Sequence, residues 1–303
     1  MSKTAFLFPG QGAQQVGMGA EIYGSLPAAR ELFDRANEFL GYDLAKLCFE
    51  GPVEKLDSTV ISQPALYVCS LAALEKLKQE QSEVVDSVAL AAGLSLGEYT
   101  AIAFAGGIEF EAGLNLVQKR GEAMQAASDS TPSGMVSVLG LDREQVAAVC
   151  DEARQEGEVL QPANYLCPGN TAVSGQKASC DSVPAAAEKL GAMKTVPLAV
   201  AGAFHTSVME SAVDKLKIAL EETEFCNTRI PVYSNVDAKP HSDGSEFKEL
   251  LLQQVCSPVL WHDSLQAMLD DGVEKFYEVG PGRVLRGLLK RVARKVPCEG
   301  TLD

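Results

Sequence analysis

The sequence lacks the features that define several common classes of protein. Its eight cysteines are scattered, with no C-x-x-C pair, so we expect reduced thiols rather than a disulfide framework or a zinc site. No apolar run approaches the roughly 18 residues that a membrane helix needs. The apolar part of the N-terminus is too short for a signal peptide. These absences predict a cytoplasmic protein with no membrane segment, no metal and no cofactor.

Positive charge is also scarce. The chain has 26 Lys and Arg against 41 Asp and Glu, a net charge of −15. Proteins that bind nucleic acid need cations to contact the phosphates, so the composition argues against that class. With 303 residues and 46% hydrophobic content, the chain can bury a large core. Helical and strand-like segments alternate along it, which predicts an α/β protein.

The strongest chemical signal is the sequence G-L-S-L-G at residues 93–97. An apolar run over 87–92 predicts a buried strand before it, and residues 98–104 predict the first turns of a helix after it. A G-x-S-x-G pattern between a strand and a helix is typical of a nucleophile elbow, which presents Ser95 on a sharp turn at a helix N-terminus. The alternative is an ordinary turn.

A second glycine-rich loop, P-G-Q-G at residues 9–12, follows a predicted strand over residues 4–8. It matches neither the phosphate-binding P-loop nor the dinucleotide-binding fingerprint. It is either a plain strand-to-helix turn or a source of backbone N–H groups that bind an oxyanion near the elbow.

Arg120 lies on or beside the apolar stripe of a helix predicted over residues 110–127. Such an arginine is either a snorkelling or ion-paired residue of the core or a clamp that binds a carboxylate in a pocket.

The chain has three histidines. His241 lies in a polar loop, where we expect a solvated side chain, and His262 lies in a helical stretch, where we expect a structural role. His205 directly precedes a helix that Thr206 or Ser207 would cap. The positive end of that helix would keep the ring neutral near pH 7. His205 is therefore the best candidate base, although no carboxylate is evident to orient it.

The segment from 129 to 199 shows a different pattern from the rest. Its predicted elements follow the order β-α-β-β-α-β, the ferredoxin-like arrangement. We therefore predict two parts: a large subdomain of residues 1–128 and 200–303, and a small ferredoxin-like subdomain of residues 129–199.

Near its C-terminus the acidic chain carries a basic helix, predicted over residues 283–293. This helix is either a solvated surface or a docking site for an acidic partner. Its basic residues and those just beyond it are Arg283, Arg286, Lys290, Arg291, Arg294 and Lys295.

These residues point to acyl transfer. Ser95 would attack a carbonyl, and His205 would take its proton and return it to the leaving group. The N–H of Leu96 and one from the loop at 10–12 would hold the oxyanion. A pocket arginine would make the acyl group one that carries a carboxylate.

The chain resembles the malonyl-CoA:acyl carrier protein transacylases of fatty acid synthesis. The matching motifs are colinear over nearly the whole chain. They are FPGQG at 8–12, GLSLGE at 93–98, QKRG at 118–121, GAFH at 202–205, YSNV at 233–236, Gln254 with residues 258–261, and EVGPG at 278–282.

The resemblance implies an α/β-hydrolase-like core with the inserted ferredoxin-like subdomain. It also implies a ping-pong cycle in which Ser95 takes malonyl from coenzyme A and passes it to the pantetheine thiol of acyl carrier protein, an acidic partner. The site residues that it implies are Arg120 for the malonyl carboxylate, Gln11 and Leu96 for the oxyanion hole, the Gln254 carbonyl to orient His205, Phe204 for malonyl over methylmalonyl, and Asn164 in the pocket.

The chain departs from the family pattern at a few positions. Leu94 stands where the family usually has histidine, while Leu166 and Asn170 stand where it usually has asparagine and glutamine. Two other functions remain open: a serine hydrolase or thioesterase on the same fold, and a non-catalytic module that docks a carrier protein.

Overall fold

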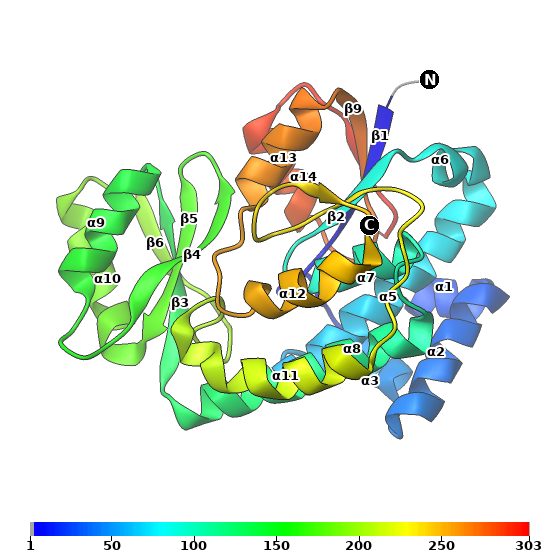
Figure 1. Ribbon diagram of the computed structural model, residues 1–303, viewed down its shortest axis with the longest axis horizontal. Coiled ribbons are helices and arrows are strands. Elements are labelled where there is room, and N and C mark those ends of the chain that lie inside the picture. Colours follow the sequence, from blue (N-terminus) through cyan, green and yellow to red (C-terminus); the bar gives the residue numbers. More distant parts are fainter. Residues whose placement is uncertain (1–2, 303) are drawn as a thin grey trace.

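The computed structural model describes residues 3–302 and contains two β-sheets. The larger sheet has six strands in the order β10-β9-β1-β2-β7-β8. These strands are β1 (Lys3–Phe8), β2 (Leu90–Gly93), β7 (Val232–Tyr233), β8 (Pro240–His241), β9 (Val273–Glu278) and β10 (Cys298–Gly300). Helices surround this sheet, and the smaller sheet projects from it in green at the left of Figure 1.

Strand β1 lies at the centre of the larger sheet because both of its faces are apolar. Phe6 and Phe8 pack into the core cluster on one face, while Ala5 and Leu7 pack into the cluster on the other. Strand β1 pairs in parallel with β2 and β9, so the carboxyl ends of all three strands meet at one edge of the sheet. The loops that follow these strands therefore lie together, and one of them contains Ser95.

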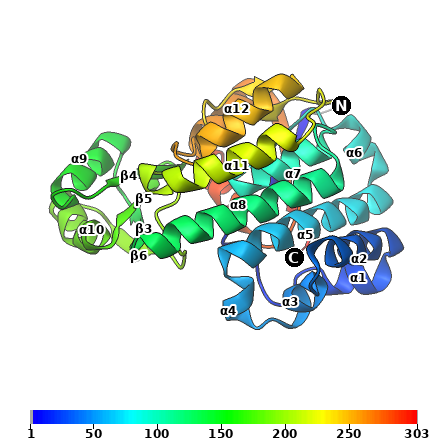
Figure 2. The ribbon, with the colours of Figure 1, turned by 60° about the horizontal axis from the view of Figure 1, so that its bottom comes forward.

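Helices cover both faces of the larger sheet. The cluster around Ala5 and Leu7 contains residues of α13 and α14, and the cluster around Phe6 and Phe8 contains residues of α2, α5, α7, α8 and α11. Helices α5, α8 and α11 pack side by side, as Figure 2 shows. The helices around this sheet are α1 (Ala20–Ser25), α2 (Pro27–Leu40), α3 (Leu44–Glu50), α4 (Val53–Leu56), α5 (Thr59–Glu80), α6 (Ser82–Ser87), α7 (Leu96–Phe104), α8 (Phe110–Ser130), α11 (Glu210–Glu222), α12 (Gly244–Gln254), α13 (Trp261–Asp270) and α14 (Val284–Val292), with a 3₁₀ turn η1 (Ser207–Met209).

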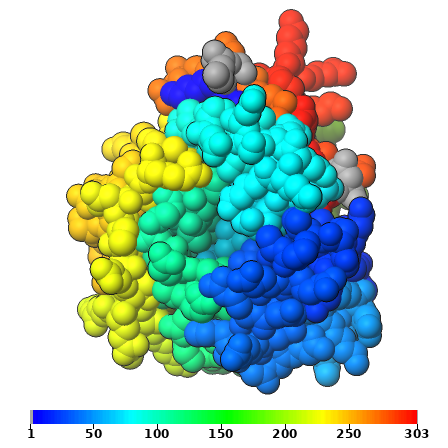
Figure 3. All heavy atoms as spheres, turned by 90° about the vertical axis from the view of Figure 1, so that its right-hand side faces the viewer, coloured from blue at the N-terminus to red at the C-terminus, as the bar shows by residue number. Residues whose placement is uncertain are grey.

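The end of the molecule opposite the smaller sheet is built from segments far apart in the sequence. Figure 3 shows the N-terminal helices in blue, α6 and its surroundings in cyan, and the segment between α11 and α12 in yellow. Among the described residues, no helix has both the length and the apolar character to cross a membrane.

The smaller sheet has the strand order β4-β5-β3-β6 and is antiparallel throughout. Residues of β3 alternate between two environments, as a strand requires. Val136 and Val138 pack into a separate core with α9 and α10, whereas Met135 and Ser137 face a cleft toward the larger sheet. The elements here are β3 (Ser133–Leu139), α9 (Arg143–Ala153), β4 (Leu160–Cys167), β5 (Asn170–Gln176), α10 (Lys177–Lys189) and β6 (Lys194–Pro197).

Most expected elements are present, with shifted ends. The strand expected over 87–92 begins only at Leu90, because residues 82–87 form α6. The helix expected to start near Ser62 begins at Thr59 and contains Pro64 in its second turn. The strand expected over 232–236 has only two residues, because the chain then turns away to form the loop before β8.

Candidate active site

Ser95 lies on a strained turn between β2 and α7, with φ 52° and ψ −103°. Glycines on either side make this turn possible. A Cβ at Gly93 would lie 1.8 Å from the backbone carbon of Gly97, and one at Gly97 would lie 2.1 Å from the carbonyl oxygen of Phe8. Side chains at these positions would therefore force the turn apart, so the glycines of the G-x-S-x-G pattern are required by packing as well as by conformation.

Asn235 holds this turn from the neighbouring chain segment. Its Oδ1 accepts a hydrogen bond from the backbone N–H of Ser95 at 2.6 Å, and its Nδ2 donates one to the carbonyl of Gly93 at 2.8 Å. Asn235 is fully buried. Asn235 was not among the predicted site residues. A polar Ser-Asn pair directly after a buried strand does indicate buried hydrogen bonds, because buried polar groups need partners.

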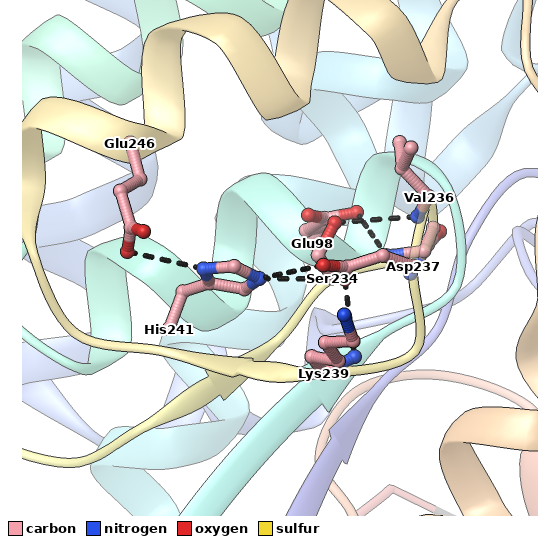
Figure 4. Close-up of polar contacts among 8 residues, drawn as sticks. Glu98, Ser234, Val236, Asp237, Lys239, His241 and Glu246 are labelled. Atoms are coloured by element: carbon pink, nitrogen blue, oxygen red, sulfur yellow. Dashed lines mark hydrogen bonds and ion pairs between the residues drawn. The ribbon is translucent and has the colours of Figure 1, made fainter.

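The loop that carries Asn235 is itself anchored by His241, contrary to the solvated side chain expected there. The His241 side chain is 14% exposed. Its Nε2 lies 3.2 Å from Asp237 and its Nδ1 lies 3.1 Å from Glu246 (Figure 4). Two carboxylates contact the ring, one at each nitrogen, an arrangement that the polar sequence of the loop did not reveal.

His205 contacts Ser95 directly. Its Nε2 lies 2.9 Å from the Ser95 Oγ, and its Nδ1 lies 2.8 Å from the backbone carbonyl oxygen of Gln254. A carbonyl only accepts hydrogen bonds, so Nδ1 carries the proton and Nε2 is free to accept one from the serine. His205 also has a positive φ of 62°, a strained conformation that the surrounding contacts must hold.

The pKa of His205 is lowered to about 4, mainly by burial and next by the charge of Arg120. The ring is therefore neutral at pH 7, as expected, but for a different reason. The residues directly after His205 form the short turn η1, which Thr206 caps through its side chain, and helix α11 begins only at Glu210. Burial is the largest cause of the lowered pKa.

Arg120 reaches the same serine from helix α8. Its Nη2 donates to the Ser95 Oγ at 2.9 Å and to the Gln254 Oε1 at 3.0 Å, and its Nη1 donates to the Gln63 Oε1 at 2.9 Å. The side chain is 1% exposed. Its hydrogen-bond partners are neutral oxygens rather than a carboxylate, so the arginine is a buried cation aimed at the nucleophile rather than half of a core ion pair.

Gln63 was not among the expected site residues. It lies in α5, most of which is buried and apolar, and the apolar pattern of this helix predicted a packing role only. A glutamine within such a run is the signal that was missed, because a buried amide needs polar partners.

A cleft of about 280 Å³ opens beside Ser95, between the two sheets. Apolar side chains from the smaller sheet, from α8 and α14 and from the loops supply much of its wall, and Leu94, directly after β2, is among them. Its lining includes the expected residues Gln11, Ser95, Arg120, Asn164, Phe204 and His205, together with the three departures Leu94, Leu166 and Asn170, and with Met124, Met135, Ser137, Ala172, Leu198, Val200, Val284 and Leu288.

Three expected residues occupy distinct positions around this cleft. Asn164, in β4, is 8% exposed, and its Oδ1 has no hydrogen-bond partner. Leu96 and Gln254 are fully buried. Leu96 is the first residue of α7, so its N–H lies where a helix leaves such groups unpaired.

The basic helix α14 borders the same cleft through Val284 and Leu288. Lys290 and Arg291 are exposed at its end. Arg286 differs, because its side chain is 20% exposed and its Nε lies 3.4 Å from the fully buried Glu278. Arg286 therefore has an internal partner. Among residues 3–302, no group of three or more His, Cys, Asp or Glu is placed to hold a metal ion.

Comparison with known proteins agrees with this geometry. The model of the acyl transferase domain family matches residues 5–299. The chain is 42% identical over 303 residues to the malonyl CoA-acyl carrier protein transacylase of Bacillus subtilis, which covers 100% of this chain and 94% of that protein. It is 42% identical over 298 residues to the human mitochondrial malonyl-CoA-acyl carrier protein transacylase, covering 95% and 76% of the two chains.

Solved structures give the same result. An acyl carrier protein S-malonyltransferase from Vibrio cholerae superposes with a TM-score of 0.92 at 38% identity, over 99% of this chain and 96% of that one. A malonyl-transacylase solved in complex with a type II PKS acyl-carrier protein gives a TM-score of 0.93 at 35% identity, over 100% and 96%. The mixed α/β fold is thus shared over the full length, and the chain belongs to the family of malonyl-CoA:acyl carrier protein transacylases.

Proposed function

We propose that this protein transfers a malonyl group from coenzyme A to the pantetheine thiol of acyl carrier protein through an ester on Ser95. The observation that carries the proposal is the placement of the Ser95 hydroxyl between a base and a cation. His205 Nε2 and Arg120 Nη2 each lie 2.9 Å from its oxygen. The base activates the nucleophile, and the cation is suited to the carboxylate that distinguishes malonyl from simpler acyl groups.

In the first half-reaction, the Ser95 oxygen attacks the thioester carbonyl and its proton moves to Nε2 of His205. The C–S bond then breaks, and the same proton goes to the departing thiolate. In the second half, the pantetheine thiol gives its proton to Nε2 and attacks the ester, and Ser95 leaves with that proton. The Gln254 carbonyl, 2.8 Å from Nδ1, keeps the ring in one tautomer and takes the place of the missing carboxylate.

The oxyanion of each tetrahedral intermediate would be held by the backbone N–H groups of Leu96 and Gln11. Leu96 supplies an N–H at the start of α7, and Gln11 lines the cleft beside Ser95. Removing one such donor typically costs roughly 3–4 kcal/mol of barrier.

Arg120 would bind the malonyl carboxylate. Its direct hydrogen-bond partners are neutral oxygens in a buried setting, which leaves the guanidinium suited to an anionic ligand. Phe204, 5% exposed in the cleft wall, would limit the size of substituents on the malonyl group. Asn164 would offer its unpartnered Oδ1 to a donor on the substrate.

For the architecture, we propose an α/β-hydrolase-like core formed by residues 1–128 and 200–303, with a ferredoxin-like subdomain of residues 129–199. The support for the subdomain is its element order, β-α-β-β-α-β, together with its strand order and separate hydrophobic core. The support for the core is the larger sheet, which is parallel except for its edge strand β8, with the elbow at the carboxyl edge of its parallel strands.

We propose that the acidic carrier protein docks on α14, mainly through Lys290 and Arg291. Both are exposed, and the same helix borders the cleft through Val284 and Leu288. Arg283 and Arg286 would contribute to the local potential. The cytoplasm is the location that we propose, and the eight free cysteines support it.

The test is covalent labelling with radioactive malonyl-CoA. Wild-type protein should retain one malonyl group that alkaline hydrolysis releases, and holo acyl carrier protein should discharge it. Ser95→Ala should retain none, whereas Ser82→Ala, an exposed serine on α6, should label as wild type does. Absence of label in wild type, or equal label in Ser95→Ala, would disprove the proposal. Release of the label to water rather than to the carrier protein would identify a hydrolase instead.

A further inference from the structure

Directly behind the elbow lies a buried carboxylate that the mechanism above does not use. Glu98, three residues after Ser95 in α7, is 1% exposed. Its Oε2 accepts a hydrogen bond from the Gln254 Nε2 at 2.6 Å and another from the backbone N–H of Asn235 at 3.1 Å. Figure 4 shows Glu98 beside the segment that contains Ser234 and Val236. Burying a carboxylate costs free energy unless it is paired and hydrogen-bonded, so we asked what Glu98 contributes next to Ser95.

The Gln254 side chain connects Glu98 to the reacting groups. Its Nε2 donates to Glu98 and also to the backbone carbonyl of Ser95 at 3.1 Å. Its Oε1 accepts from Nη2 of Arg120 at 3.0 Å. Its backbone carbonyl contacts Nδ1 of His205. One fully buried residue therefore touches the nucleophile, the base and the arginine.

The orientation of this amide is decided by its two charged neighbours. An ionised carboxylate only accepts hydrogen bonds, and a guanidinium only donates them. The Gln254 amide therefore has one arrangement that satisfies both, with its nitrogen toward Glu98 and its oxygen toward Arg120. The flipped arrangement would place oxygen against oxygen at Glu98 and N–H against N–H at Arg120.

We propose that Glu98 is a positioning residue for malonyl recognition. Its carboxylate fixes the Gln254 amide, and that amide holds the Arg120 guanidinium where it meets the malonyl carboxylate. The proposal rests on the function proposed above and adds to it a residue that acts through Gln254 without touching the substrate. It predicts that Glu98 affects dicarboxylic acyl groups more than simple ones, because only the former have a carboxylate for Arg120 to bind.

The ionisation of Glu98 gives a second consequence. Burial raises the pKa of Glu98 to about 7, while hydrogen bonds from Gln254, Asn235 and Ser234 and the charge of Arg120 act in the opposite direction. A protonated carboxyl would present O–H toward Gln254. The form that orients the amide therefore accumulates as the pH rises through about 7, and malonyl selectivity should rise with it. The other titratable group that interacts with Glu98 is Tyr99, whose pKa is raised to about 12, so it stays neutral in this range.

The direct test compares Glu98→Gln with wild type in loading from malonyl-CoA and from acetyl-CoA. Glutamine keeps the shape but removes the negative charge, so the Gln254 amide loses its charge-assisted acceptor and is held only by Arg120 and the Ser95 carbonyl. We expect the ratio of malonyl to acetyl kcat/KM to fall about tenfold, as for loss of one charge-assisted hydrogen bond. Thermal unfolding checks that the variant is folded. A folded variant with an unchanged ratio would overturn the proposal.

An Arg120→Ala background shows whether Glu98 acts through the arginine. There, Glu98→Gln should change malonyl loading less than twofold, and a further tenfold loss would mean that Glu98 acts by another route.

The pH profile of the wild type is a test that needs no variant. The ratio of malonyl to acetyl kcat/KM should drop below pH 7, and a flat ratio between pH 5.5 and 8 would contradict the proposal. If wild type does not load malonyl, the proposed function itself fails. If wild type loads it and only the Glu98 effects are absent, the function stands without this inference.

Discussion

Arg120 and Ser95 are in direct contact, with Nη2 of the arginine 2.9 Å from the serine oxygen. The serine oxygen therefore accepts from a cation on one side and lies 2.9 Å from a neutral imidazole on the other. The same positive charge contributes to the low pKa of His205. One arginine thus favours negative charge on the Ser95 oxygen and helps to keep His205 neutral, and in the proposed function it would also bind the substrate carboxylate.

The shape of the guanidinium should matter as well as its charge. Arg120 makes three hydrogen bonds, to Gln63, Ser95 and Gln254, and an ammonium on a different stem cannot reproduce that planar pattern. We expect Arg120→Lys to lower kcat/KM for malonyl-CoA by at least tenfold while acetyl loading changes much less. Steady-state loading with both thioesters measures this. Parallel losses for the two substrates would show that Arg120 acts on the serine alone.

Stability at acid pH should depend on His205. Its pKa is lowered from 6.5 to about 4 in the folded protein, so between these values the unfolded chain binds a proton that the folded one does not. Stability from this residue is therefore complete above pH 6.5 and is lost as the pH falls toward 4. We expect about 2 kcal/mol less unfolding free energy at pH 5 than at pH 7.5 from this source.

The measurement is urea unfolding of wild type and His205→Asn at both pH values. Glu98 titrates in the same pH range, and because its pKa is raised in the folded protein its contribution to stability grows as the pH falls. Comparing wild type with His205→Asn at each pH removes this shared contribution. The stability deficit of the variant should shrink by about 2 kcal/mol on going to pH 5. A deficit that is the same at both values would contradict the assignment of a neutral, buried His205.

Asn235 should be important for stability and for activity. Asn235→Ala leaves the Ser95 N–H and the Gly93 carbonyl without the partners they have at 2.6 and 2.8 Å. Unpaired buried polar groups cost about 1–3 kcal/mol each. We expect the variant to lose about 3 kcal/mol of unfolding free energy and most of its loading rate. Gln266→Ala, which removes only an exposed bond to Asp270, is the control and should change neither by much.

The elbow glycines offer a test of the packing argument. Gly93→Ala would place a Cβ 1.8 Å from the backbone of Gly97, so we expect loss of the folded state or a fall in melting temperature of more than 10 °C, equivalent to several kcal/mol. Gly24→Ala is the matched control, because a Cβ there meets nothing within 4 Å and lies in helix α1. It should stabilise the protein slightly. Equal melting temperatures for the two variants would refute the close approach.

Carrier-protein docking on α14 can be separated from chemistry. The double variant Lys290→Glu/Arg291→Glu should raise the KM for acyl carrier protein about tenfold at low salt, because two attractive contacts become repulsive. Loading from a short malonyl thioester without a nucleotide should be unaffected. Lys215→Glu/Lys217→Glu on α11, also exposed, is the charge-matched control. An equal KM effect from the two pairs would indicate overall charge rather than docking.

Features of this protein that depend on local pattern were predictable from its amino-acid sequence. The G-x-S-x-G run between an apolar strand and a helix placed Ser95 on a turn that only flanking glycines permit. The period of the apolar residues placed α2 and α8 closely. The order of elements in residues 129–199 was also readable, because each has its own periodicity and turn signals.

Contacts between segments far apart in the chain were visible only in the folded structure. No local pattern predicts that Gln63 and Gln254 meet at Arg120, or that Asn235 closes the elbow from 140 residues away. His241 shows the same limit, since its loop sequence is polar but its ring is mostly shielded from solvent and contacts two carboxylates. Burial and long-range charge set the pKa of His205 and Glu98. Residue types are visible in a sequence, whereas the dielectric and the partners around them exist only once the chain is folded.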